Sequence, residues 1–464
     1  MRTIKLLLKE NRKILLILLI ALVFRLVLLP LRNHDDLFSN AAWGEKIYMQ
    51  GTKDFYENEK WIYSWPSQLP LMNLTYVFDF VIFAKLLTAF TKVAQLLSNN
   101  NFLPGIFSHW FNFVDWFGWK YYLETPFFNG FLISIKILPV VCDLAIAAFL
   151  YSFGKKVTKK ETAILITLLY LFLPFSWYVS SLWGQYDQIS AFLLVLAFVF
   201  LQKKRGAIGG LMHIASPVFF FLATQIKPHT FFVAPLYVFL YLKKKPSFIS
   251  FLYSLLIVGG IFIYTLNEFS DRNLWVYFYK IVLPRVFISE RMVIATHSFN
   301  FWQTLYPIKA ESTHTFLFGI SNFVWGNIFI LSINIAGIYL ALKKKFNLEG
   351  IISGAYVVSA GYYIFGTGML DRYYFPGMLF FTVLILFNKY LLRLWLAASV
   401  LFSLNLVLSW GYPFITYTNN VIWNQEYLVS VLSFLQTAIF ISSLFVLYDI
   451  KVKAFKIERV RKAI

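Results

Sequence analysis

Two adjacent carboxylates, Asp35 and Asp36, directly follow the first long apolar stretch of the chain. A carboxylate at the mouth of a helix can take a proton from a hydroxyl group, which is the work of a general base. The simpler interpretation is that one of the two caps the helix that follows. This segment alone leaves both interpretations open.

Two cations, Lys227 and Arg372, stand in short polar segments between apolar stretches, Lys227 before Pro228 and Arg372 after Asp371. An ammonium group or the planar fork of a guanidinium is suited to binding phosphate. The alternatives are a lysine that snorkels to the membrane surface and a structural Asp371–Arg372 ion pair.

The segment from Trp183 to Asp187 reads Trp-Gly-Gln-Tyr-Asp. Its glycine permits a tight turn, while Gln185 and Asp187 carry oxygens that bind sugar hydroxyls or a metal ion. A turn with a capping aspartate and an interfacial tryptophan is the alternative. No ligand spacing in the chain demands a metal ion. A divalent cation is still compatible with the site, but its ligands stay unassigned.

The composition indicates the kind of fold that positions these residues. Hydrophobic residues make up 59% of the 464, charged residues 14%, and the mean hydropathy is +0.66. Apolar stretches of roughly 17 to 25 residues recur, each long enough to cross a bilayer as a helix. We therefore expect an all-α, polytopic transmembrane bundle that forms a single membrane-embedded domain, 1–464. The twelve expected spans are 14–31, 127–153, 161–181, 188–202, 207–225, 229–242, 247–267, 316–342, 350–366, 373–388, 391–411 and 428–449.

The positive charges predict the orientation. If both termini are cytoplasmic, seven basic clusters between the spans fall on the cytosolic side, as the positive-inside rule requires. The same distribution argues against a nucleic-acid partner, although the net charge is +20. Two long outer loops remain, 33–126 and 268–315, and we expect 74–97 to be an interfacial or re-entrant helix in the first. The candidate residues above then lie on the extracytoplasmic face of the cell membrane.

In this topology the short outer loops contain Lys227 and Arg372 as their two basic residues, against the general bias, and a phosphate partner would explain both. Lys136 and Asp143 are ionisable residues inside a span, seven residues apart on one helix face. Such residues are functional candidates by default, and a structural role in the bundle is the equal alternative.

The residues resemble, in order along most of the chain, the motifs of the GT-C glycosyltransferases, in particular the bacterial relatives of the GPI-anchor mannosyltransferases. The matching elements are an Asp seven residues before a Trp (Asp36 and Trp43), Trp-Gly-Gln-x-Asp (Trp183 to Asp187), Lys-Pro (Lys227-Pro228), Asn-x-Trp (Asn300 to Trp302) and a partial His-Glu-Arg-Tyr (Leu370 to Tyr373). Leu370 and Asp371 stand where the family has His and Glu, a departure that concerns how the donor phosphate is held.

The resemblance implies a GT-C-like fold and inverting transfer of a hexose, expected to be mannose, from a polyprenyl-phosphate donor to a hydroxyl of a lipid or glycan acceptor. Asp36, with Asp35 as second choice, would be the catalytic base. Arg372, Lys227 and Asp371 would hold the donor phosphate. The expected substrate-binding residues are Trp183, Gln185, Asp187, Asn300 and Trp302. The alternative is a polytopic transporter or a flippase for lipid-linked sugars, for which internal half-repeats would be typical.

Overall fold

The computed structural model describes residues 2–29, 31, 36–57, 65–82, 85, 126–202, 206–271, 273–284, 286, 293–307, 315–410 and 425–450, with the side chains of 2–10, 126–131, 207 and 410 excepted. The candidate base Asp35 and most of the expected helix 74–97 lie outside the described residues. Within them a helix runs over Pro70–Ile82.

Among the described residues, seven helices are long and apolar enough to cross a membrane. An eighth crossing is formed if two helices that meet at a 53° bend before Pro174 count as one span. The chain is therefore a membrane-embedded helical protein. The seven are α6 (Pro126–Val157), α10 (Ala207–Ile226), α12 (Phe248–Phe269), α15 (Asn322–Lys343), α16 (Leu348–Phe365), α18 (Leu392–Trp410) and α20 (Glu426–Leu447), and the bent pair is α7 (Lys160–Phe172) with α8 (Pro174–Trp177) and the π-helical turn η1 (Tyr178–Trp183).

Three further helices of the bundle are shorter than the roughly 20 residues of a typical transmembrane helix. The longest of them, α9 (Asp187–Phe200), has 14 residues and so spans about 21 Å. The others are α11 (Ala234–Lys243) and α17 (Phe375–Leu384), which continue from the 3₁₀ turns η2 (Pro228–Val233) and η6 (Asp371–Tyr374). Helix α9 starts at Asp187, and the turns that lead into α11 and α17 start directly after Lys227 and at Asp371.

The remaining elements connect these helices or precede them. They are α1 (Arg2–Leu28), α2 (Asp36–Gln50), α13 (Leu274–Tyr277), η3 (Phe278–Val282), α14 (Phe301–Leu305), η7 (Lys389–Leu391) and the strands β1 (Ala295–Thr296), β2 (Phe316–Leu317), β3 (Ile320–Ser321) and β4 (Met369–Leu370). Strand β1 pairs in parallel with β4, and β2 pairs antiparallel with β3. The expectation of helix from residue 316 is wrong by six residues, because Gly319 turns the chain back with a φ of +77° and the Ser321 side chain then caps α15.

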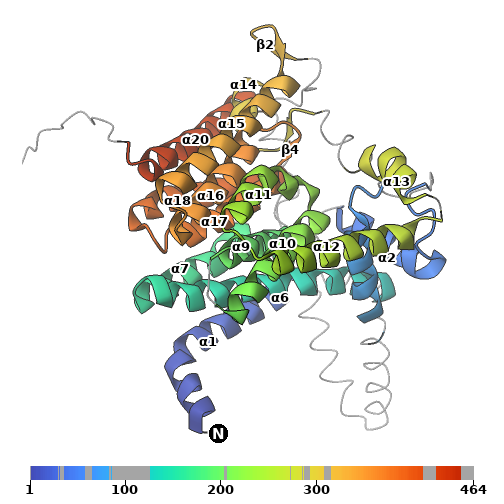
Figure 1. Cartoon of the computed structure of the whole chain (residues 1–464), viewed down its shortest axis with the longest axis horizontal. Helices are drawn as coiled ribbons and strands as arrows, with labels where there is room; N and C mark the ends of the chain where they lie inside the picture. The colour runs from blue at the N-terminus through green and yellow to red at the C-terminus, as the bar shows by residue number, and fades with distance from the viewer. Residues whose placement is uncertain are drawn as a thin grey trace, which may run out of the picture.

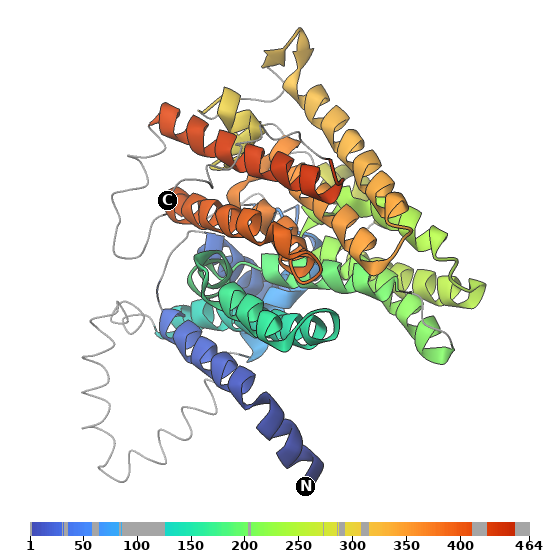
Figure 2. The same cartoon turned by 90° about the vertical axis from the view of Figure 1, so that its left-hand side faces the viewer.

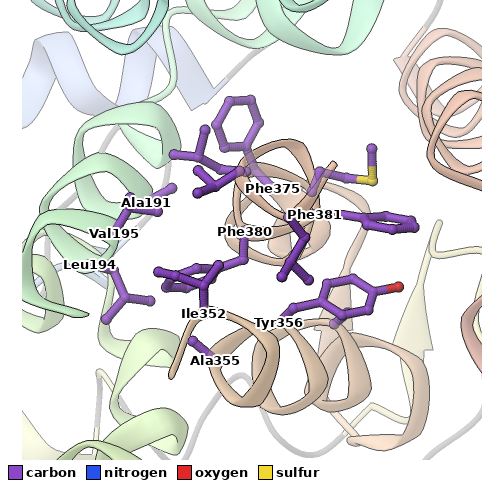
Figure 3. Close-up of a cluster of buried hydrophobic side chains, with 14 of the residues drawn as sticks. Ala191, Leu194, Val195, Ile352, Ala355, Tyr356, Phe375, Phe380 and Phe381 are labelled. Atoms are coloured by element: carbon purple, nitrogen blue, oxygen red, sulfur yellow. The ribbon is translucent and has the colours of Figure 1, made fainter. Parts of the chain in front are cut away.

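Two groups of helices make up the molecule (Figures 1 and 2). Helices α6, α7, α9, α10 and α12 form one group, and α15, α16, α18 and α20 form the other, while α1 leads away from the first group. The apolar core lies where α17 packs between α9 and α16, with Phe380 of α17 pointing toward Leu194 and Phe381 stacked on Tyr356 (Figure 3). A core of this kind fixes the start of α17, which follows directly on the turn η6 that carries Arg372.

The two ends of the helices differ in charge. Basic residues stand where α6, α11 and α15 end, and the Lys244 ammonium donates to the carbonyl of Phe346 at 2.9 Å, so two of these ends meet. The candidate site residues stand at the opposite helix ends, in the connections before α9, after α10 and before α17. The segregation expected from the sequence is therefore present in the described part of the fold.

Candidate functional site

The carboxylate of Asp36 is the point where three chain segments meet. Asp36 is the first residue of α2, and its Oδ2 accepts a hydrogen bond from Nε2 of Gln185 at 3.1 Å. The same oxygen forms an ion pair with Nη2 of Arg372 at 3.4 Å. Gln185 and Arg372, which lie about 150 and more than 300 positions after Asp36 in the sequence, thus both bind the same oxygen atom of Asp36.

A left-handed glycine positions Gln185. The π-helical turn η1 ends at Gly184, which has a φ of +70°, and a Cβ at this position would lie 2.7 Å from Cγ of Lys136. Only glycine therefore fits both the backbone conformation and the space. After this turn the amide of Gln185 bridges two groups, because Nε2 donates to Asp36 and Oε1 accepts from Nζ of Lys227 at 3.0 Å.

Lys227 is a buried cation at the end of α10, where Pro228 begins the next turn. Its Nζ lies 3.3 Å from Oδ2 of Asp187, a carboxylate that is itself fully buried. Burial lowers the pKa of Lys227, and the negative charge of Asp187 opposes this shift. The pairing thus compensates an ammonium group that lies out of water.

Arg372 is held on three sides. The face of its guanidinium lies over the Trp183 ring, 5.0 Å from the ring centroid, and Asp371 accepts the backbone N–H of Arg372 at 2.7 Å. Burial acts to lower the pKa of Arg372, but the carboxylates, Asp36 first, outweigh it and raise the pKa above its ordinary value. Arg372 is therefore a permanent cation in a fixed orientation.

A cavity of about 80 Å³ opens beside Lys227. Lys227 and His229 contribute to its wall, and the imidazole of His229 stacks on the ring of Tyr373 with centroids 4.0 Å apart. Burial, then the charges of Lys227 and Arg372, lower the pKa of His229 well below its ordinary value, so this imidazole is neutral at pH 7. His229 precedes α11 and lies outside the seven long helices.

Exposure distinguishes the members of the cluster. The side chain of Asp36 is 35% exposed, while those of Arg372, Lys227 and Asp187 are 11%, 3% and 0% exposed. A reacting hydroxyl can therefore reach Asp36 directly, whereas the cations lie deeper. Trp183, expected to contact substrate, is fully buried, and its ring lies against the guanidinium of Arg372.

Asn300 and Trp302 bond to a different part of the fold. Asn300 Nδ2 donates to the carbonyl of Tyr363 at 3.3 Å, and Trp302 Nε1 donates to that of Phe365 at 2.8 Å. Their segment also supplies β1, which pairs with β4 just before Asp371. In this arrangement the two residues brace the loop that presents Arg372.

The described residues contain no group of three or more His, Cys, Asp or Glu side chains arranged to hold a metal ion. A carboxylate that the sequence analysis did not select, Asp79 of helix Pro70–Ile82, accepts a hydrogen bond from the hydroxyl of Tyr186. Burial raises the pKa of Asp79 to about 7, and the Tyr186 hydrogen bond opposes this shift. A lone acid in an apolar helix was the available signal for Asp79.

Lys136 and Asp143 of α6 serve separate partners. Nζ of Lys136 donates to the carbonyls of Leu29 and Leu31 at 3.0 and 2.8 Å and so caps the end of α1, just ahead of Asp36. Asp143 pairs with Arg25 of α1 at 2.7 Å, a partner that the sequence analysis missed. Both residues join α1 to the bundle.

No protein-family model matches the chain, and no curated protein matches it in sequence.

Proposed function

We propose that the chain is a membrane-embedded glycosyltransferase that moves a hexose, mannose for preference, from a polyprenyl-phosphate donor to a hydroxyl of a lipid or glycan acceptor. The observation that carries the proposal is the meeting of Asp36, Arg372 and Lys227 in one cluster, in which Lys227 also lines a cavity. The cluster combines an accessible carboxylate with two buried cations, which are the groups that deprotonation of an acceptor and departure of a phosphate require.

Asp36 is the proposed general base. Its Oδ2 is held by Gln185 and Arg372, which fixes the orientation of the carboxylate. Proton removal from the acceptor hydroxyl lets that oxygen attack the anomeric carbon from the side opposite the phosphate, so the configuration inverts. The bond from sugar to phosphate breaks, and the phosphate leaves with the electron pair.

Arg372 and Lys227 are the proposed ligands of that phosphate, with Asp371 holding Arg372 in place. Phosphate is a good leaving group, so positive charge at the departing oxygen replaces a strong general acid. Both cations are already partnered by carboxylates, Asp36 and Asp187. An incoming phosphate therefore meets two basic side chains that each already lie beside a carboxylate.

The lengths of the helices support a donor that is a lipid. A 14-residue helix such as α9 covers about 21 Å of the roughly 30 Å of hydrocarbon. If its basic end reaches the cytosolic interface, its other end, at Asp187, stops about 10 Å below the outer one. A site at that depth faces the head group of a membrane lipid.

We propose in addition a GT-C-like bundle of twelve spans, with this site on the extracytoplasmic side and both termini in the cytoplasm.

Labelling of single cysteines tests this orientation. Phe318, 88% exposed in the β2–β3 turn before α15, lies at the site end of the helices, and the exposed Lys156 lies at the basic end. In a chain with Cys142 replaced by alanine, a membrane-impermeant maleimide should label Phe318→Cys in intact cells and Lys156→Cys only after permeabilisation. The reverse pattern would put the cluster in the cytosol and overturn the extracytoplasmic assignment.

The activity itself is tested on membrane glycolipids. Lipid extracts from cells with the chain, without it and with Asp36→Asn should differ in a product heavier by one hexose, present only with the parent chain. If all three extracts agree while membrane vesicles take up or flip a sugar lipid only with the parent chain, the transporter or flippase alternative replaces the transferase.

A further inference from the structure

The cavity beside Lys227 holds two polar atoms that the proposed chemistry does not use. Nε2 of His229 and Oε1 of Gln68 are both buried and make no hydrogen bond, and both residues line this cavity. His229 is more than nine-tenths buried. A buried polar atom without a partner costs free energy, so two of them at one cavity indicate a ligand that satisfies both.

The chemistry of the two atoms selects the ligand. The amide oxygen of Gln68 only accepts a hydrogen bond, so it needs a donor and disfavours a phosphate oxygen. The imidazole of His229 is neutral, and a hydroxyl group can pair with either of its tautomers because it both donates and accepts. Neutral hydroxyl groups therefore fit both atoms.

The size and the remaining wall of the cavity agree with a single sugar ring. About 80 Å³ is room for on the order of six water molecules. Phe232 and Tyr362 line another part of the wall as a stacked pair, with centroids 4.2 Å apart. Apolar faces with a few convergent polar atoms are typical of small-molecule sites.

We propose that this cavity binds the hexose ring of the substrate, with ring hydroxyls paired to His229 and Gln68 and the linked phosphate at Lys227. The phosphate part of this inference rests on the proposed function, whereas the ring part rests on the two unpaired atoms. His229 and Gln68 are then residues that determine which sugar is accepted.

The test compares four ligands that differ only in whether they carry a sugar and in which sugar it is. The purified full-length chain in detergent is titrated with farnesyl phosphate and with farnesyl phosphate linked to mannose, glucose or galactose. At least one sugar should tighten binding by about 10-fold or more, the usual effect of pairing a buried polar atom. His229→Phe keeps the stack on Tyr373 but removes the nitrogen, so it should abolish that gain and leave the Kd of farnesyl phosphate unchanged.

A second variant and two controls complete the experiment. Gln68→Met should reduce the same gain, Lys227→Met should weaken all ligands equally, and Lys156→Met at the basic end should change none. If the parent binds farnesyl phosphate but gains nothing from any sugar, or if His229→Phe keeps the gain, the sugar pocket is refuted while the phosphate site stands. If the parent binds none of the four, the donor class of the proposed function fails, and the pocket assignment fails with it.

Discussion

The described residues include two buried networks of carboxylates and cations, which differ in how far their polar atoms have hydrogen-bond partners. In the network of Arg25 and Asp143, Oδ1 of Asp143 accepts from the Tyr170 hydroxyl at 2.5 Å, and Oδ2 accepts from Arg25 at 2.7 Å and Ser180 at 3.2 Å. Arg25 also donates to the carbonyl of Leu171, near the break between α7 and α8. This network is closed, and it joins α1, α6, α7 and η1.

The network around Asp36 is open by comparison. Asp36 is partly exposed, Nε of Arg372 and Oδ1 of Asp187 make no hydrogen bond, and a cavity adjoins Lys227. Buried charges are therefore common to both networks. The second network differs because some of its polar atoms lack a hydrogen-bond partner and a cavity adjoins it. The comparison indicates that the first network stabilises the fold and the second binds ligand.

The largest expected effect is that of Asp36→Asn on activity. The change is nearly isosteric and keeps a hydrogen-bonding group, but it removes the proposed base, which typically contributes ~10²–10⁴ in rate. Sugar transfer by purified protein should fall by that factor while the amount of folded protein and the Kd of the donor hold. Transfer at a rate close to that of the parent would remove Asp36 from the mechanism.

Asp143→Asn should act on stability instead. It leaves Arg25 as an uncompensated charge in a fully buried place, and breaking a buried pair costs about 3–5 kcal/mol. Thermal unfolding in detergent should shift downward, with activity per folded molecule close to that of the parent. If Asp143→Asn instead abolishes transfer without loss of stability, the division between the two networks is wrong.

Arg372→Lys sharpens the role of the open network. The charge remains, but the planar fork that faces Asp36 and lies on Trp183 is lost. Loss of one preorganised group at a developing charge costs about 10²–10³ in rate, and we expect turnover to fall by such a factor. Lys156→Ala at the basic end is the matched control, and equal losses in both variants would point to general damage.

Glu349→Gln should have the smallest effect. Glu349 pairs with Lys344 at 2.5 Å near the start of α16, where the two side chains are 31% and 18% exposed. Pairs in contact with water contribute only about 0–1 kcal/mol. The unfolding temperature in detergent should change little. A decrease as large as that of Asp143→Asn would show that burial does not determine how much an ion pair stabilises this protein.

Much of this protein could be read from its sequence. The apolar stretches located the helices, since hydrophobic length is a local property, and the lysine clusters separated the two helix ends. The motif positions of Asp36, Gln185, Asp187, Lys227 and Arg372 predicted a shared site, and the structure brings these five side chains together.

Only the tertiary structure decided which side chain meets which. The pairing of Arg25 with Asp143, the brace formed by Asn300 and Trp302, and the cavity at His229 all depend on packing between segments far apart in the chain. A charged residue in an apolar segment indicates that a partner is needed, because burying an unpaired charge costs too much free energy. The identity of that partner, and whether a ligand has to supply it, is set by the geometry of the packed helices.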